Sequence, residues 1–263
     1  MPHFQSDGVE IAYIDEAPDA GAGAAAGEVV LLIHGFASSL RVNWVETGWV
    51  RTLTGAGYRV VALDNRGHGG SAKLYAPEQY GGPVMAEDAR RLLDHLGVEA
   101  AHVMGYSIGA RIAAFLALAH PRRVRSLVFG GLGFNMVRGM AGTGPIAHAL
   151  EADSIEQVVN PTARTFRAFA EQTGSDLRAL AACIRSSRDP IRAEALATLR
   201  TPLLVVVGEL DVIGGSAEAL AAIVPGAEGF VIAGRDHMKA VGDRSYKARV
   251  LAFLDRVRGG AGG

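Results

Sequence analysis

Short apolar runs alternate along the chain with longer stretches in which apolar residues recur at helical spacing. Continuous apolar runs of this length are typical of strands buried on both faces of a parallel sheet. They occupy residues 29–33, 58–63, 101–104, 126–129 and 203–207. The helical patterns lie at about 40–55, 83–96, 108–119, 215–223 and 240–257. This alternation predicts an α/β fold with a mostly parallel central sheet and helices on both faces.

The alternation stops between residues 134 and 199, where no apolar run of the buried-strand kind occurs. Amphipathic pieces such as 163–172 and 176–185 take its place. The pattern predicts a helical insert between two consecutive strands of the sheet. Inserts at that point lie over the carboxyl ends of the strands, where open α/β sheets bind ligands. We therefore expect a core formed by 1–133 and 200–263 and a small helical lid at 134–199, the alternative being a helical addition without a role at the site.

Composition narrows the function classes. The chain has 263 residues, 49% of them hydrophobic, which suffices for one α/β core with an insert. The formal net charge of −1 creates no overall field that favours nucleic acid or anionic membranes as partners. The single cysteine, Cys183, excludes an internal disulfide and a cysteine-based metal cluster. No signal-peptide pattern and no membrane-spanning apolar stretch is present, so we expect a cytoplasmic protein. The lone cysteine and the lack of a histidine–carboxylate cluster with ligand spacing predict no metal or organic cofactor, and the substrate is expected to be a small molecule.

The segment Gly105-Tyr106-Ser107-Ile108-Gly109 lies between an apolar strand pattern and an apolar helix pattern. A Gly-x-Ser-x-Gly sequence in that setting is typical of a nucleophile elbow, in which a tight turn presents the serine hydroxyl. The glycines are expected because a Cβ at either position would clash at the bend. Ser107 is therefore the candidate nucleophile for attack on a carbonyl carbon.

A serine nucleophile needs a base, and the base needs an orienting acid. His237 follows the apolar run 230–232, so its loop is expected at the carboxyl edge of the sheet. Asp211 follows the strand pattern at 203–207 and is the candidate acid. Glu209 and Asp236 are the alternatives to Asp211. The resulting order of serine, acid and histidine is one of the known orders of a catalytic triad.

Donors for the developing oxyanion are expected from two backbone N–H groups. One belongs to Ile108, directly after the nucleophile and at the start of a helix. The other belongs to Phe36, in the His34-Gly35-Phe36-Ala37 loop that follows the strand at 29–33. Gly35 allows the backbone to turn there, and His34 is expected to hold the loop rather than to act as a base.

Five segments together resemble the α/β-hydrolase fold family, in its compact serine esterase, haloperoxidase-like and carbon–carbon hydrolase branch. They are His34-Gly35-Phe36, Asp64-Asn65-Arg66-Gly67-His68-Gly69-Gly70-Ser71, the Ser107 motif, Gly208-Glu209-Leu210-Asp211 and Asp236-His237. The resemblance implies an α/β-hydrolase fold in which Asp64, Arg66 and His68 shape the site. It also implies acyl-enzyme chemistry, since dehalogenases and epoxide hydrolases of this fold use Asp where this chain has Ser107.

The leading hypothesis is a carboxylic-ester hydrolase for small, largely uncharged substrates. Candidate substrate-binding residues are Tyr106, Phe134, Met136 and Met238, with Phe36, Phe166 and Phe169 as further pocket candidates or core residues. The same triad also serves carbon–carbon hydrolysis, lactone opening and acyl transfer. A non-catalytic small-molecule receptor on the same fold is the alternative outside enzymes. The sequence indicates no oligomeric state.

Overall fold

The computed structural model describes residues 1–21, 27–139, 143–186 and 190–260. Its sheet has eight strands in the spatial order β1-β2-β4-β3-β5-β6-β7-β8. The first two strands form an antiparallel hairpin, and β2 pairs antiparallel with β4. All other pairs are parallel. The strand bounds are β1 His3–Ser6, β2 Val9–Glu16, β3 Val29–Ile33, β4 Arg59–Leu63, β5 Ala101–Tyr106, β6 Val124–Gly130, β7 Leu203–Gly208 and β8 Glu228–Ile232.

The apolar runs form the central strands, as the sequence predicts. Every residue of β3, β5 and β7 is buried. Such strands carry no polar alternation because helices cover both of their faces. The parallel register sets Ile33 beside Gly105, so the ends of β3 and β5 meet at one edge of the sheet. The loops that leave these strands therefore begin side by side.

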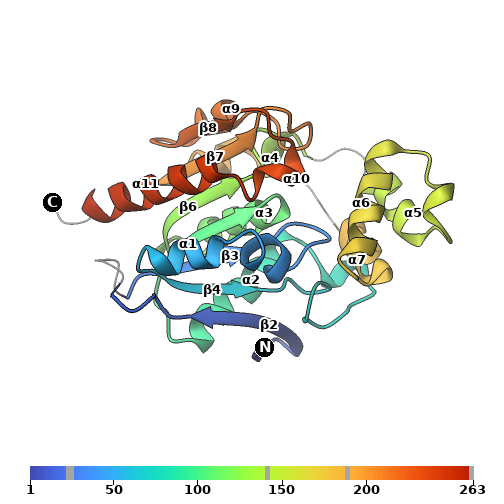
Figure 1. Ribbon diagram of the computed structural model, residues 1–263, viewed down its shortest axis with the longest axis horizontal. Coiled ribbons are helices and arrows are strands. Elements are labelled where there is room, and N and C mark those ends of the chain that lie inside the picture. The colour runs from blue at the N-terminus through green and yellow to red at the C-terminus, as the bar shows by residue number, and fades with distance from the viewer. Residues whose placement is uncertain (22–26, 140–142, 187–189, 261–263) are drawn as a thin grey trace.

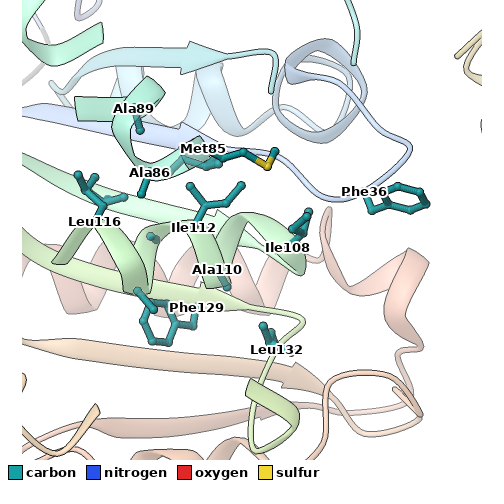
Figure 2. Close-up of a cluster of buried hydrophobic side chains, with 14 of the residues drawn as sticks. Phe36, Met85, Ala86, Ala89, Ile108, Ala110, Ile112, Leu116, Phe129 and Leu132 are labelled. Atoms are coloured by element: carbon teal, nitrogen blue, oxygen red, sulfur yellow. The ribbon is translucent and has the colours of Figure 1, made fainter. Parts of the chain in front are cut away.

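Two apolar cores lie on opposite faces of the sheet, because successive residues of a strand point to opposite sides. On one face α2 (Gly82–His95), α3 (Ile108–Ala119) and α9 (Ala217–Ala221) pack on the strands. On the other face lie α1 (Trp49–Gly55) and α11 (Arg244–Gly260). Figure 2 shows part of the first core, where Met85 and Ala86 of α2 face Ile112 of α3. The prediction of helices on both faces is confirmed.

Two helical patterns are interrupted in the structure. The stretch 40–55 forms a π-helix, η1 (Arg41–Val45), and then α1, with Gly48 between them in the left-handed region at φ 79°. The stretch 240–257 falls partly in α10 (His237–Ala240) and mainly in α11. The prediction of two continuous helices is wrong because local turns override apolar spacing, which reports only the buried face.

Where the structure describes them, residues 134–199 contain helices and no strand. They comprise α4 Asn135–Arg138, α5 Thr143–Glu151, η4 Ile155–Gln157, α6 Pro161–Gln172, α7 Leu177–Arg185 and α8 Ala193–Leu196. Figure 1 shows α5, α6 and α7 grouped at one side of the molecule, apart from the helices that flank the sheet. The hydroxyl of Thr173, just after α6, donates a hydrogen bond of 3.0 Å to the carbonyl of Ala37. This group of helices therefore reaches the loop that follows β3.

The short helices η2 (Pro77–Gln79) and η3 (Pro121–Arg123) complete the described elements. No helix in the described ranges is both long and apolar enough to cross a bilayer.

Candidate active site

Ser107 stands alone between β5 and α3, in a backbone conformation that L-residues rarely adopt. Its φ is 54° and its ψ is −114°. A Cβ on Gly105 would overlap the backbone of Gly109, and a Cβ on Gly109 would overlap the carbonyl oxygen of Ile33 in β3. The expectation that both glycines are sterically required is confirmed, although Gly109 is confined by the neighbouring strand rather than by the bend itself. The surrounding packing maintains this strained backbone conformation, and the turn presents the Ser107 hydroxyl.

His237 connects the elbow to an acidic side chain. Its Nε2 lies 3.1 Å from Ser107 Oγ, and its Nδ1 lies 2.7 Å from Asp211 Oδ2. An ionised carboxylate can only accept, so the hydrogen-bond pattern assigns the imidazole proton to Nδ1. Nε2 is then left with a lone pair directed at the serine hydroxyl. This is the arrangement that a serine nucleophile requires of its base.

The Asp211 side chain is fully buried, and its second carboxylate oxygen is held by backbone hydrogen bonds. Its Oδ1 accepts hydrogen bonds from the backbone N–H groups of Ile213 and Gly214, at 2.8 and 2.9 Å. Because the loop after β7 supplies these donors, the carboxylate is satisfied and oriented before any substrate arrives.

The two alternative acids are occupied elsewhere. Glu209 accepts a hydrogen bond of 2.8 Å from the N–H of Gly234. Asp236 caps the N-terminus of α10 by accepting from the N–H groups of Met238 and Lys239. Neither carboxylate is oriented toward the imidazole of His237 by these bonds, so the geometry favours Asp211 as its acid.

Tyr106, directly before the nucleophile, contacts the histidine loop. Its hydroxyl donates a hydrogen bond to the backbone carbonyl of His237. Burial raises the pKa of the Tyr106 phenol well above its usual range, and the charge of Asp211 adds to the effect. The hydroxyl is therefore a permanent donor, and it ties the end of β5 to the start of α10. Sequence reasoning assigned Tyr106 to substrate binding and did not find this contact.

The loop after β3 lies against the elbow, as the oxyanion-hole hypothesis requires. An ideal Cβ on Gly35 would be 3.6 Å from Ser107 Cβ. Ala37 in the same loop has a positive φ of 58°. The N–H of Gly35 donates a hydrogen bond of 2.7 Å to Asn43 Oδ1. Asn43 thus fixes the peptide between His34 and Gly35, one peptide before that of the Phe36 N–H, a role with no local signal in the sequence.

His34 is buried beneath this loop. Its Nε2 accepts a hydrogen bond of 3.0 Å from the N–H of Asn65, so its Nδ1 carries the proton and donates to the carbonyl of Gly35. Burial lowers the pKa of His34 to about 4. The imidazole is therefore neutral and holds the loop, as expected from the sequence.

Buried charged side chains hold the loop after β4 in place through hydrogen bonds and an ion pair. Asp64 accepts from the N–H groups of Leu40 and Gly70, at 2.7 Å each. Arg66 forms a two-pronged ion pair with the buried Asp88. His68 packs edge-on against the ring of Phe36. These residues contact the loops around the site and do not reach the hydroxyl of Ser107 through any of these bonds.

Two cavities open at Ser107. The larger cavity has a volume of about 170 Å³ and is lined by Tyr106 and Met238, among others. The smaller cavity has a volume of about 30 Å³ and is lined by Ile108, Arg111, Leu132 and Ile213, together with three residues that also line the larger one. The shared residues are Phe36, Ser107 and Phe166.

Phe134 and Met136 line neither of these cavities, in contrast to the sequence hypothesis. Met136 is fully buried in the core at the start of the insert, and its carbonyl accepts from the N–H of Ile191. Phe134 precedes α4 and is only partly buried. The chain turns into the core directly after β6, a tertiary effect that an apolar sequence pattern does not reveal. Phe166 and Phe169 of α6 line the larger cavity instead.

Within the described residues, no group of three or more His, Cys, Asp or Glu side chains is placed to hold a metal ion. The imidazole of His237 and the carboxylate of Asp211 are bonded to each other. The chemistry available at the site is therefore that of a hydroxyl, an imidazole and a carboxylate in series.

Comparison with known proteins identifies the fold of the chain. Residues 28–140 match the family described as the alpha/beta hydrolase fold, and this span contains both the loop after β3 and Ser107. The chain has the α/β-hydrolase fold. A crystal structure of a hydrolase from Pseudomonas aeruginosa superposes with a TM-score of 0.76 at 25% identity, covering 96% of this chain and 97% of that one.

Two curated relatives of this chain carry different functional names. Epoxide hydrolase B from Mycobacterium tuberculosis is 39% identical over 102 residues, which are 39% of this chain and 28% of that protein. The dihydrolipoyllysine-residue acetyltransferase component of the acetoin cleaving system from Pseudomonas putida is 31% identical over 249 residues, covering 88% of this chain and 65% of that protein. The chain thus spans less than two thirds of the length of each.

Proposed function

We propose that this protein is a serine hydrolase that cleaves a carboxylic ester of a small, largely uncharged substrate through an acyl-enzyme on Ser107. The observation that carries the proposal is the position of His237, whose two ring nitrogens contact Ser107 Oγ at 3.1 Å and Asp211 Oδ2 at 2.7 Å. A hydroxyl at a strained turn, a base and a buried acid in one line are the parts of an acyl-transfer triad.

Acylation follows from these contacts. His237 Nε2 accepts the Ser107 proton as Oγ bonds to the ester carbonyl carbon, and Asp211 stabilises the imidazolium that forms. The backbone N–H groups of Ile108 and Phe36 are proposed to donate to the oxyanion. Ile108 begins α3, where the first N–H groups lack partners within the helix and the dipole favours negative charge. His237 then protonates the leaving alkoxide as the carbon–oxygen bond breaks.

Deacylation repeats the sequence with water. His237 Nε2 accepts a proton from water as the water oxygen attacks the acyl carbonyl, and it returns that proton to Ser107 Oγ as the carboxylic acid leaves. No proton or electron is left over, and the triad returns to its starting state.

The nucleophile itself favours acyl chemistry over the epoxide opening named for the mycobacterial relative. Attack by Ser107 on a saturated carbon would form an ether, which has no carbonyl for water to attack and would leave the protein alkylated. Attack on a carbonyl forms an ester, which the same triad can hydrolyse. Of these two reactions, a serine hydroxyl therefore supports repeated turnover only with the acyl substrate.

We further propose that residues 134–199 act as a lid on a core formed by 1–133 and 200–263. Phe166 and Phe169 of α6 line the larger cavity, and Thr173 bonds to the loop after β3. A helical insert in contact with both the cavity and the oxyanion loop would exclude water from the acyl-enzyme.

Hydrolysis of p-nitrophenyl acetate by the wild type and by Ser107→Ala tests the proposed activity. We expect turnover in the wild type and a loss of at least about a thousandfold in the variant. Equal rates in the two proteins would show that any hydrolysis is not due to Ser107. A substrate panel with a lactone and a vinylogous diketone distinguishes ester cleavage from the related activities, since a dominant rate on either would replace the ester assignment.

A further inference from the structure

The two cavities at Ser107 differ in size and in their relation to the base. His237 lines the larger cavity and does not line the smaller one, whereas Ile108 lines only the smaller one. Phe36 and Phe166 border both, and their rings pack edge to face with centroids 5.9 Å apart. The two rings thus form a partition across the site, with Ser107 at the point where the cavities meet.

The proposed reaction assigns one cavity to each of the two parts of an ester, the acyl chain and the leaving group. The leaving oxygen must come within hydrogen-bond distance of the group that protonates it, which is His237 Nε2. The leaving group therefore extends into the larger cavity. The acyl chain departs from the opposite side of the carbonyl carbon, toward Ile108, Leu132 and Ile213. Figure 2 shows Phe36, Ile108 and Leu132 at the same end of α3, on the loop after β3, the first turn of the helix and the segment after β6 respectively.

The volumes then set the size of each arm. A cavity of about 150 Å³ is known to hold a benzene ring, so the larger cavity of about 170 Å³ has room for a group of that size. The smaller cavity of about 30 Å³ is about twice the minimum of roughly 10–15 Å³ that a cavity needs to hold one water molecule, which suits a methyl group.

The larger cavity is also uncharged. Its walls include Val42, Phe169 and Val241, and among the residues that the structure describes no Lys, Arg, Asp or Glu side chain lines it. Apart from Tyr106, Ser107 and His237, the polar side chains that line it are those of Ser38, Asn43 and Thr47, and the Thr47 hydroxyl donates to the backbone carbonyl of Asn43. The Ser38 hydroxyl is buried and has no hydrogen-bond partner among the described residues. Asn43 uses its Oδ1 for the N–H of Gly35. A neutral leaving group is therefore favoured, because a charged one would be desolvated without a partner.

We propose that the site is specific for esters of a very short acyl group, of acetyl size, with a neutral leaving group as large as a single aromatic ring. This inference rests on the proposed ester hydrolysis. Leu132 and Ile213 set the limit on the acyl chain, and Phe169 with Val42 sets the limit on the leaving group.

Two substrate series test the wild type. With p-nitrophenol as a constant leaving group, kcat/KM is expected to fall at least about tenfold from acetate to hexanoate, since a methylene that does not fit costs tenfold or more. With acetate as a constant acyl group, benzyl acetate is expected to exceed methyl acetate by at least about tenfold, because the ring is buried in the apolar cavity. A preference for hexanoate, or for methyl over benzyl, would overturn the assignment.

Matched variants separate the two cavities. Ile213→Ala shortens a side chain that, of the two cavities, lines only the smaller one. It keeps the backbone N–H that donates a hydrogen bond to Asp211. It is expected to raise the hexanoate-to-acetate ratio of kcat/KM about tenfold and to leave the benzyl-to-methyl ratio unchanged. Leu132→Ala should act in the same direction, which keeps the test valid if one variant is unstable. Phe169→Ala should change the benzyl-to-methyl ratio and leave the acyl ratio unchanged.

Failure of this inference is distinguishable from failure of the proposed function. Turnover that depends on Ser107 but shows a flat acyl profile, or an Ile213→Ala variant altered only in its leaving-group ratio, would overturn the cavity assignment alone. Absence of any Ser107-dependent ester turnover would overturn both.

Discussion

The phenol hydroxyl of Tyr106 lies 2.6 Å from the backbone carbonyl oxygen of His237 and donates a hydrogen bond to it. The bond joins the residue before Ser107 to the residue that we propose as the base of Ser107. Their side-chain rings also lie 5.5 Å apart between centroids. Because both residues are buried, we expect this hydrogen bond to hold the backbone of His237, and with it the imidazole, in position next to Ser107.

Tyr106→Phe removes only that hydroxyl. It leaves the carbonyl of His237 without its buried donor, so the unfolding free energy should fall by about 1–2 kcal/mol. A looser imidazole should lower kcat about tenfold, with little change in KM, since one tenfold step in rate corresponds to about 1.4 kcal/mol. Denaturant unfolding and steady-state kinetics check both effects.

Tyr246→Phe is the matched control. Tyr246 is fully buried in the core between the sheet and the helices α1 and α11. Its hydroxyl has no hydrogen-bond partner among the described residues. Its removal leaves no group unpaired, so stability and kcat should stay the same or rise. Equal losses in the two variants would show that the Tyr106 bond has no particular role.

Asp211→Asn tests the identity of the acid. The amide keeps an oxygen for the N–H groups of Ile213 and Gly214, but its NH₂ group would face Nδ1 of His237 and favour the tautomer with a proton on Nε2. That nitrogen could then no longer accept the Ser107 proton. We expect kcat/KM to fall by about 10³–10⁴, measured on a p-nitrophenyl ester.

Glu209→Gln and Asp236→Asn serve for comparison, because each keeps the acceptor oxygen that its present bond uses. Both should retain kcat/KM within about threefold, less than 1 kcal/mol of transition-state stabilisation. A severe loss in either, with a near wild-type rate in Asp211→Asn, would transfer the role of acid to that residue.

The buried His34 makes stability depend on pH. Its pKa is lowered to about 4 by burial, whereas the unfolded chain titrates near 6.5. Between these values the unfolded state binds a proton that the native state excludes, so the unfolding free energy falls as the pH falls from about 6.5 to 4. The contribution is about 3 kcal/mol over that window. His34→Gln should show a correspondingly shallower pH dependence in guanidinium unfolding, and parallel curves for the two proteins would refute this account.

Gly109→Ala tests the steric requirement at the elbow. The added Cβ would overlap the carbonyl oxygen of Ile33, which is backbone and cannot move aside without disturbing β3. We expect a loss of stability of at least about 2–3 kcal/mol together with most of the activity. Gly144→Ala, in α5 where a Cβ meets nothing within 4 Å, should be neutral or slightly stabilising. Similar thermal unfolding of both variants would contradict the requirement.

The fold was predictable where burial is nearly complete. The run 29–33 coincides with β3, and 108–119 coincides with α3, because both elements sit in the middle of the molecule and show their burial directly in the sequence. The prediction fails where a local turn intervenes. η1 ends at Val45 and Gly48 precedes the first residue of α1, although the apolar spacing continues through this turn without a break.

The sequence predicted the three side chains that meet at the candidate site, but it did not predict the residues that hold the surrounding loops in place. Ser107, Asp211 and His237 follow three strands whose carboxyl ends share one edge, so parallel topology alone brings them together. Asn43 gave no signal, because its bond to Gly35 depends on how η1 packs. The absence of Met136 from the cavities has the same origin, since the path of the chain after β6 is decided by tertiary packing.

Covalent labelling of the native protein by phenylmethylsulfonyl fluoride, followed by peptide mass spectrometry, tests the central claim most directly. The account predicts a single sulfonyl adduct on Ser107 that forms in parallel with loss of esterase activity. The adduct should be absent from Ser107→Ala and form at least about a hundredfold more slowly in His237→Ala, where the base is missing. A folded wild type that forms no adduct on Ser107, or one that labels equally fast without His237, would contradict it.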